Sequence, residues 1–222
     1  MSRDSKVGGT KRRVLDVVGF TAIIVLFLLY MVPFILVLLN SFKNPFSFIT
    51  EKGYTLANYT KAFEKMEFIK AFGNSLFITG LSTLLVIIFA SMVAYYFTRA
   101  KNTFSRVFFA LMAASMIIPF QAIMIPLVSV YGGTLNILNH RLTLIFMHTG
   151  FSMAMSVFMF HGFIRGSIPL ALEEAAYIDG CTHTQTFFRI VFPLLKPIIS
   201  TMVIMNAMAF WNDFLLPSLV LT

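Results

Sequence analysis

The chain has 222 residues, of which 58% are hydrophobic and 12% are charged. Soluble domains carry about 25% charged residues, so this composition excludes an ordinary soluble globular protein and is typical of a membrane protein. The net charge of +8 would suit a nucleic-acid partner, but the basic residues lie between apolar runs and form no single stripe, which excludes that partner. The single cysteine, Cys181, excludes a disulfide framework within the chain.

Five apolar runs are long enough to cross a bilayer, which takes about 20 residues of helix. They are residues 17–39, 71–98, 107–131, 142–164 and 197–222. The first follows a basic cluster like that of a signal peptide, but it is longer than the roughly 7–15 apolar residues of such a peptide, and no small-residue cleavage site follows it. We therefore expect a retained first span and an all-α, polytopic transmembrane helix bundle. Pro119 and Pro126 are expected to kink the third span.

The distribution of Lys and Arg predicts the orientation. If the N-terminus is cytoplasmic, the basic residues divide 11 inside to 6 outside, as the positive-inside rule requires. The inside set is Arg3, Lys6, Lys11, Arg12, Arg13, Arg99, Lys101, Arg106, Arg165, Arg189 and Lys196, and the outside set is Lys43, Lys52, Lys61, Lys65, Lys70 and Arg141. We expect a cytoplasmic tail at 1–14, a partly helical external loop at 40–70 and a cytoplasmic loop at 165–196. Five spans would leave the C-terminus outside, so we expect a sixth span to be missing.

The expected cytoplasmic loop contains a compact acidic segment, LEEAAYIDG, at residues 172–180. Pro169 suits a first helical turn, Ser167 is a candidate cap, and Gly180 is placed to end the helix in a left-handed conformation. A second short helix is expected at about 184–192. Leu172, Ala175, Ala176 and Asp179 share one helical stripe. The stripe could dock a partner protein, or the helix could simply be solvated and anchor the loop near lipid headgroups, although acids suit an anionic leaflet poorly.

The longer stretch EEAAYIDGCTHTQTFFRIVFPLLKP, residues 173–197, resembles the EAA loop of the membrane subunits of ABC importers. That pattern is Glu-Ala-Ala, three residues, Gly, nine residues, then Ile-x-Leu-Pro. It is matched at Glu174, Ala175, Ala176, Gly180, Ile190 and Pro193, while Phe192 replaces the usual Leu and Cys181 stands where Ala is frequent. The flanking FIRGSIPLALEEAA and the later FWNDFLLP, residues 210–217, look like the carbohydrate branch, the relatives of the maltose permease.

This resemblance implies a type I ABC importer permease fold with six spans in the cytoplasmic membrane. The chain would carry a sugar or oligosaccharide by alternating access, together with a second permease subunit, an extracytoplasmic sugar-binding protein and a dimer of ATPase subunits that bind ATP and Mg²⁺. The EAA loop would dock in a groove of the ATPase, with Glu174 meeting a basic residue there. The coupling residues implied are Glu173, Glu174, Ala175, Ala176, Asp179, Gly180, Ile190 and Pro193.

Candidate substrate-path residues gather in the last apolar run. Asp213 is the one carboxylate there, and its neighbours bring amides and an indole that could contact the hydroxyls and the apolar face of a sugar. The candidates are Gln121, Asn206, Trp211, Asn212 and Asp213, with Asn74 and Ser115 as weaker ones. The alternative is that Trp211 sits in the interfacial aromatic belt and Asp213 at the external end of its helix.

No catalytic constellation or metal site is predicted, and the chain lacks the phosphate-binding loop of an ATPase, so it is not expected to be an enzyme or to hold a cofactor itself. His148 and His161 lie 13 residues apart in one run, too far for a shared metal site within one helix. Three other functions remain open. They are an ion- or proton-coupled secondary transporter using His148, His161 and Asp213, an ABC permease for a solute other than a sugar, and a membrane scaffold. The chain shows no internal repeat of the kind that secondary transporters have.

Overall fold

The computed structural model describes residues 4–43 and 53–221, and it divides into two compact units, 1–71 and 72–222. Residues 1–3 of the expected tail, 44–52 of the expected external loop and Thr222 lie outside the described residues. Within the described part, all regular structure is helical except for an isolated antiparallel bridge between Lys43 and Tyr54. The all-α prediction is therefore confirmed.

The first unit contains α1 (Asp4–Ser41) and α2 (Ala57–Lys65). Apart from the half-buried Met31, the large apolar side chains of α1 from Leu15 onward are exposed, as expected of a helix whose surroundings are lipid. The Asn58 amide donates hydrogen bonds to the backbone carbonyls of Ser41 (2.9 Å) and Lys43 (2.8 Å). Asn58 thereby satisfies carbonyls that the end of α1 leaves without helical partners, and it fixes the start of α2 beside them.

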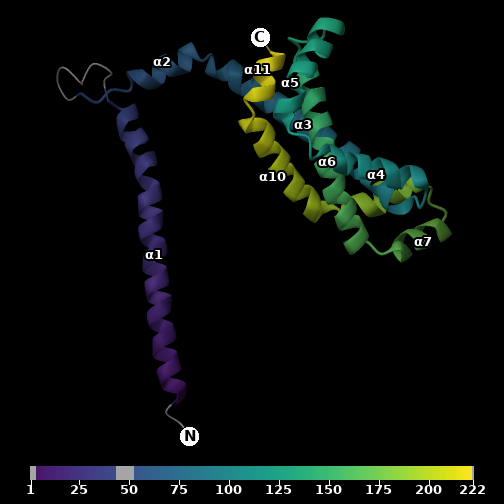
Figure 1. The fold of residues 1–222 in the computed structure, drawn as a ribbon, viewed down its shortest axis with the longest axis horizontal. Coiled ribbons are helices and arrows are strands. Elements are labelled where there is room, and N and C mark those ends of the chain that lie inside the picture. Colours follow the sequence, from purple (N-terminus) through teal and green to yellow (C-terminus); the bar gives the residue numbers. More distant parts are fainter. Residues whose placement is uncertain (1–3, 44–52, 222) are drawn as a thin grey trace. The chain divides into compact units, whose positions relative to one another are not determined.

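The second unit is a bundle of helices, and Figure 1 labels the longer ones together with α11. The helices of the bundle are α3 (Phe68–Arg99, entering from the first unit), α4 (Thr103–Ser115), α5 (Phe120–Val128), η1 (Ser129–Thr134, a π-helix), α6 (Arg141–Ser167), α7 (Leu170–Ile178), α8 (His183–Thr186), η2 (Phe187–Val191, a π-helix), α9 (Phe192–Leu194), α10 (Lys196–Asn212) and α11 (Leu215–Val220). The central helix is α6, which contacts α4, α10 and α11. Helices α11 and α7 lie at opposite ends of α6 (Figure 1).

Within the described part of the chain, three helical segments are long and apolar enough to span a membrane: Leu15–Ser41, α3 and α6. The number is up to five if each of two bent helix pairs is one span. The run 107–131 is not one helix, because α4 and the α5–η1 segment meet at 97°. Pro119 stands at this break, where it lacks an N–H for a continuing helix. The run 197–222 also breaks, since two residues separate the end of α10 at Asn212 from the start of α11 at Leu215. Helix α10 itself meets the α8–α9 segment at 74°.

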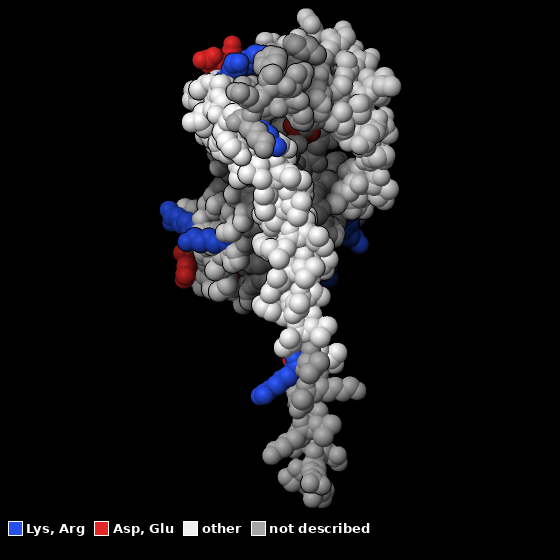
Figure 2. Space-filling model, turned by 90° about the vertical axis from the view of Figure 1, so that its left-hand side faces the viewer, with Lys and Arg blue, Asp and Glu red and all other residues white. Residues whose placement is uncertain are grey.

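Side chains of α6 belong to both hydrophobic clusters of the bundle. The larger cluster is Val86, Ile87, Ala90, Ala94, Val157, Phe160, Ile164, Ile168, Phe187, Val191, Leu195, Ile198, Met202 and Phe210. The smaller one is Ile78, Leu127, Leu144, Ile145, Met147, Leu216 and Val220. On the face shown in Figure 2, the charged side chains that the structure describes form a few separate groups among uncharged residues. Among the described residues, two contacts between a basic and an acidic side chain join helices of the bundle, Arg99–Glu173 and His148–Asp213, and they lie near opposite ends of α6.

Candidate functional site

Helix α7 begins after Pro169, which occupies the N-cap position with an extended backbone. Ser167 is the last residue of α6, so the prediction that it caps α7 is wrong; Ile168 and Pro169 make the turn instead. The prediction for Gly180 is confirmed, since its φ of +82° is in the left-handed region that favours glycine. The second short helix is also confirmed as α8–η2–α9, and it starts at a reciprocal capping box between Thr182 and Gln185.

The two faces of α7 have different environments. Glu173 and Ala176, three residues apart, are 1% and 3% exposed and face the bundle. Leu172, Glu174, Ala175, Ile178 and Asp179 are exposed, with Ile178 at 86%. The expected stripe is therefore divided, because Ala176 points inward while the other three members point outward. Among the coupling candidates on the following segment, Ile190 is half-buried in η2 and Pro193 is exposed in α9.

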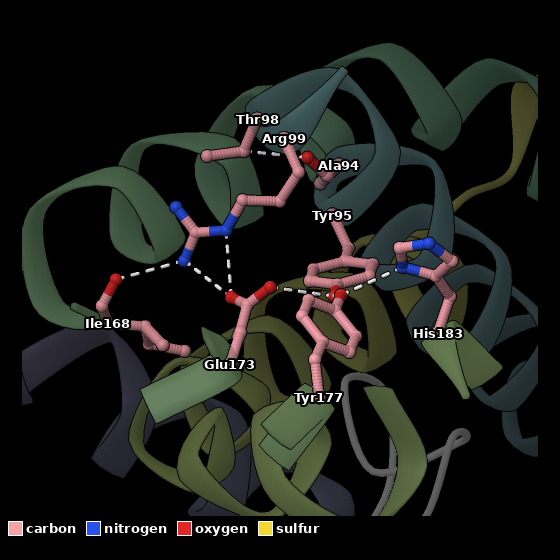
Figure 3. Close-up of polar contacts among 8 residues, drawn as sticks. All are labelled: Ala94, Tyr95, Thr98, Arg99, Ile168, Glu173, Tyr177 and His183. Carbon is pink, nitrogen blue, oxygen red and sulfur yellow. Dashed lines mark hydrogen bonds and ion pairs between the residues drawn. The ribbon is translucent and has the colours of Figure 1, made fainter. Parts of the chain in front are cut away.

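The Glu173 carboxylate is buried in a polar network at the end of α3 (Figure 3). Arg99 donates to Oε1 through Nε at 2.8 Å and approaches it through Nη2 at 2.7 Å. The Tyr95 hydroxyl donates to Oε2 at 2.7 Å. Arg99 Nη2 also donates to the backbone carbonyl of Ile168 at 2.9 Å, between α6 and α7. Both carboxylate oxygens are thus occupied from within the chain, so Glu173 does not belong to the exposed face on which it was expected to act.

The same network continues into α8. The Tyr177 hydroxyl lies 3.4 Å from the Tyr95 hydroxyl and 2.8 Å from Nδ1 of His183 (Figure 3). The Tyr95 ring also packs on Phe187 of η2, with ring centroids 5.2 Å apart. Side chains of α3, α7 and α8 therefore hold one another in a fixed arrangement. In contrast, Glu174 makes no hydrogen bond or ion pair with any residue the structure describes.

At the other end of α6, His148 meets Asp213 of the α10–α11 break. His148 Nε2 lies 3.1 Å from Asp213 Oδ2, and the imidazole stacks on the Phe210 ring at a centroid distance of 4.6 Å. Asp213 Oδ1 accepts hydrogen bonds from the backbone N–H groups of Leu215 (3.0 Å) and Leu216 (3.4 Å), which begin α11. The carboxylate thus joins α6 to the start of α11.

A pocket of about 710 Å³ opens beside this pair. Its polar lining is Ser115, His148, Ser152 and Asp213, and its aromatic lining is Phe120, Phe151 and Phe210. Hydroxyl and carboxylate groups beside aromatic rings are a lining that a polyhydroxylated molecule could fill.

Of the five path candidates, only Asp213 lines this pocket. Gln121 is exposed on α5, and Asn206 is buried but donates to the Met202 carbonyl of its own helix. Trp211 packs edge-on against Phe72, and Asn212 donates to the Met208 carbonyl. Of the two weaker candidates, Ser115 lines the pocket, whereas Asn74 does not and accepts a hydrogen bond from Arg141.

The two histidines of α6 are in different places. His161 packs on Phe109, with ring centroids 4.3 Å apart, and only His148 contacts Asp213. Among the described residues, no group of three His, Cys, Asp or Glu side chains is arranged to hold a metal ion. The structure therefore does not bring His148, His161 and Asp213 together as one relay.

Comparison with known proteins places both sites within a matched region. Residues 86–222 match the family described as binding-protein-dependent transport system inner membrane component. The chain is 41% identical over 206 residues to a probable starch degradation products transport system permease protein, AmyC, of Thermoanaerobacterium thermosulfurigenes, covering 89% of this chain and 73% of that protein. It is 38% identical over 191 residues to the melibiose/raffinose/stachyose import permease protein MelC of Bacillus subtilis, covering 83% and 68%. It is 32% identical over 209 residues to the arabinooligosaccharides transport system permease protein AraQ of Bacillus subtilis, covering 87% and 71%.

Proposed function

The chain belongs to the family of binding-protein-dependent transport system inner membrane components, and from this premise we propose that it is the permease subunit of an ABC importer for oligosaccharides. It is a multi-pass membrane protein of the type I permease fold. The relatives named above are permeases for starch degradation products, for melibiose, raffinose and stachyose, and for arabinooligosaccharides. These substrates share sugar units joined by glycosidic bonds, which supports oligosaccharides as the substrate class.

The observation that carries the coupling part of the proposal is the divided surface of α7. Its inner face is fixed to the bundle by Glu173, whereas its outer face presents Glu174, Ala175 and the 86% exposed Ile178. An exposed apolar side chain beside a small residue and an unpaired carboxylate suits a surface that a soluble protein covers. In the proposed transporter, that protein is an ATPase subunit, which binds ATP and Mg²⁺ and accepts α7 in a groove.

The pocket beside His148 and Asp213 is the part of the proposed substrate path contributed by this chain. Asp213 supplies a carboxylate for sugar hydroxyls, and Phe210 supplies an aromatic face. A second permease subunit would complete the path, and an extracytoplasmic binding protein would deliver the sugar. Family membership argues against the ion- or proton-coupled secondary transporter and against the scaffold. The sugar substrates of the relatives favour a sugar over another solute.

A direct test of this function is to purify the transporter through a tag on this chain and to reconstitute it in vesicles. We expect an ATP-hydrolysing subunit and a second permease to accompany the chain. Uptake of radiolabelled maltotriose or raffinose, delivered with the matching binding protein, should require ATP. Recovery of the chain without an ATPase, or uptake that follows a proton gradient in the absence of ATP, would contradict the proposal.

The proposal also implies the orientation of the chain in the membrane, with the N-terminus and α7 in the cytoplasm. A reporter enzyme that is active only in the cytoplasm should be active when fused after Gly166 and inactive when fused after Asn136. The reason is that these positions lie near opposite ends of α6, a candidate span. A reporter that works only outside the cytoplasm, fused at the same two positions, provides the matched control. The opposite pattern would place α7 outside the cell and exclude contact with a cytoplasmic ATPase.

A further inference from the structure

We propose that Glu173 and Arg99 form a clamp that makes the docking helix α7 move with α3, so that an ATPase displacing α7 displaces α3 directly. This inference rests on the proposed function, and it assigns Glu173, Arg99 and Tyr95 as positioning residues. None of the three lies on the exposed face of α7. Their role would be to carry movement from that face into the bundle.

The chain itself connects α7 to α6, not to α3. Only Ile168 and Pro169 separate the two helices, and both have extended backbone angles, so this connection is a short turn and not a continuous rigid rod. The buried polar contacts run elsewhere, from α7 to the last turn of α3, which is 74 residues earlier in sequence at Arg99. Arg99 also holds the Ile168 carbonyl, so its guanidinium closes the junction between α6 and α7 as well (Figure 3).

The physical reason that this contact transmits movement is the burial of its charge. Glu173 is 1% exposed, and its two oxygens accept from Arg99 and Tyr95. Separating α7 from α3 would leave a carboxylate in the bundle without its partners, which is strongly unfavourable. The helices therefore move together more readily than they separate.

Helix α3 can pass that movement onward. It continues without a break from Phe68 to Arg99, and its residues Val86, Ile87, Ala90 and Ala94 are part of the larger hydrophobic cluster. A displacement applied at Arg99 thus acts on the same cluster that contains residues of α6 and α10. Close-packed interiors transmit such displacements because they have few voids to absorb them.

The experiment uses the assembled transporter in vesicles and measures sugar imported per ATP hydrolysed. In Glu173→Gln, we expect the ATPase to remain bound and ATP hydrolysis to continue, while import per ATP falls roughly tenfold, within the range by which coupling residues act. Tyr95→Phe removes one hydrogen bond and no charge, and it should lower the ratio roughly threefold.

The matched controls are Tyr96→Phe and Thr98→Val. The Tyr96 side chain bonds Asn102, the Thr98 side chain bonds the Ala94 carbonyl, and neither side chain reaches α7. Both controls should keep the wild-type ratio.

A second readout follows the movement itself. In a Cys181→Ala background, spin labels at Tyr96 of α3 and Leu170 of α7, both exposed and neither on the proposed docking face, report the distance between the helices by electron resonance. We expect the same distance with and without ATP in the otherwise wild-type chain, and a broadened, nucleotide-dependent distribution in Glu173→Gln.

Two results would overturn the inference, and a third would overturn the function on which it rests. A nucleotide-dependent distance with an intact clamp and normal import would overturn the inference, as would wild-type import per ATP in both Glu173→Gln and Tyr95→Phe. If Glu173→Gln fails to assemble with the ATPase, the import per ATP measured for Tyr95→Phe still tests the inference. Absence of an ATPase from the wild-type preparation would overturn the proposed function itself, and it is seen before any variant is compared.

Discussion

Replacing Glu174 by Lys is expected to abolish ATP-driven sugar uptake without preventing insertion of the chain into the membrane. Glu174 is exposed and has no hydrogen-bond or ion-pair partner among the residues that the structure describes, so the fold does not depend on it. In a partner's groove the situation differs, because truncating one side of a buried charged contact typically costs about 2–5 kcal/mol. Charge reversal adds repulsion from the basic residue that the groove is proposed to contain. The loss corresponds to roughly 30-fold or more in affinity.

The measurement is the amount of ATPase that co-purifies with the tagged chain, together with uptake in the same membranes. The control is Glu64→Lys, which makes the same charge reversal at an exposed position of α2 and outside the docking helix. This control should retain both the ATPase and uptake. If Glu174→Lys also retains both, the outer face of α7 is a solvated surface and the ATPase binds elsewhere.

The ends of α7 could be predicted from sequence because local residues determine them. Gly180 supplies a left-handed conformation that other residues adopt at a cost, and Pro169 suits the entry to a helix. The rotation of α7 about its axis could not be predicted in this way. Glu173 and Glu174 are adjacent and chemically identical, and which of them faces the bundle depends on Arg99, far away in sequence.

The positive-inside rule places Arg99 on the cytoplasmic side by its charge alone, and it does not predict the contacts of Arg99 with Glu173 and Ile168. Two features of the sequence point weakly to these contacts. Arg99 is a basic residue at the end of a long apolar run, and Glu173 is one acid more than the Glu-Ala-Ala pattern requires. A charge next to a buried position needs a partner, but several acids and bases could have supplied it. Only the packing of α3 against α7 selects the pair.

The breaks in the third and fifth runs show a similar limit. Pro119 predicts an interruption because it lacks an N–H, but the 97° angle depends on what α4 and α5 pack against. At the end of α10, the sequence predicts that Asp213 lies near the substrate, whereas its hydrogen bonds to the backbone of α11 depend on the break between the two helices. The pairing with His148 joins residues 65 apart, so neither residue's own neighbourhood indicates it.

The His148–Asp213 contact has a structural consequence that can be measured separately from transport. His148 is 3% exposed, and its Nδ1 has no hydrogen-bond partner among the described residues, so the imidazole depends on Asp213 for its hydrogen bond. Asp213→Ala leaves this buried group unsatisfied, which costs about 1–3 kcal/mol, and removes the acceptor at the start of α11, which costs about 1 kcal/mol more. We expect purified Asp213→Ala to unfold at a clearly lower temperature than the wild type.

Asp213→Asn separates that structural role from a role in the substrate path. Its amide oxygen can still accept from the N–H groups of Leu215 and Leu216, because Asn is as good a cap as Asp. Its amide N–H can donate to Nε2 of His148 in the tautomer that carries the proton on Nδ1, so the buried imidazole keeps a hydrogen bond. We therefore expect near-wild-type thermal stability and normal ATPase retention. Uptake should fall, since a neutral amide replaces the one carboxylate of the pocket, and a carboxylate makes stronger hydrogen bonds to sugar hydroxyls than an amide does. Asn212→Ala is the matched control, because Asn212 bonds only within its own helix. Normal uptake by a stable Asp213→Asn variant would show that Asp213 serves the fold alone, and that the sugar passes without contacting it.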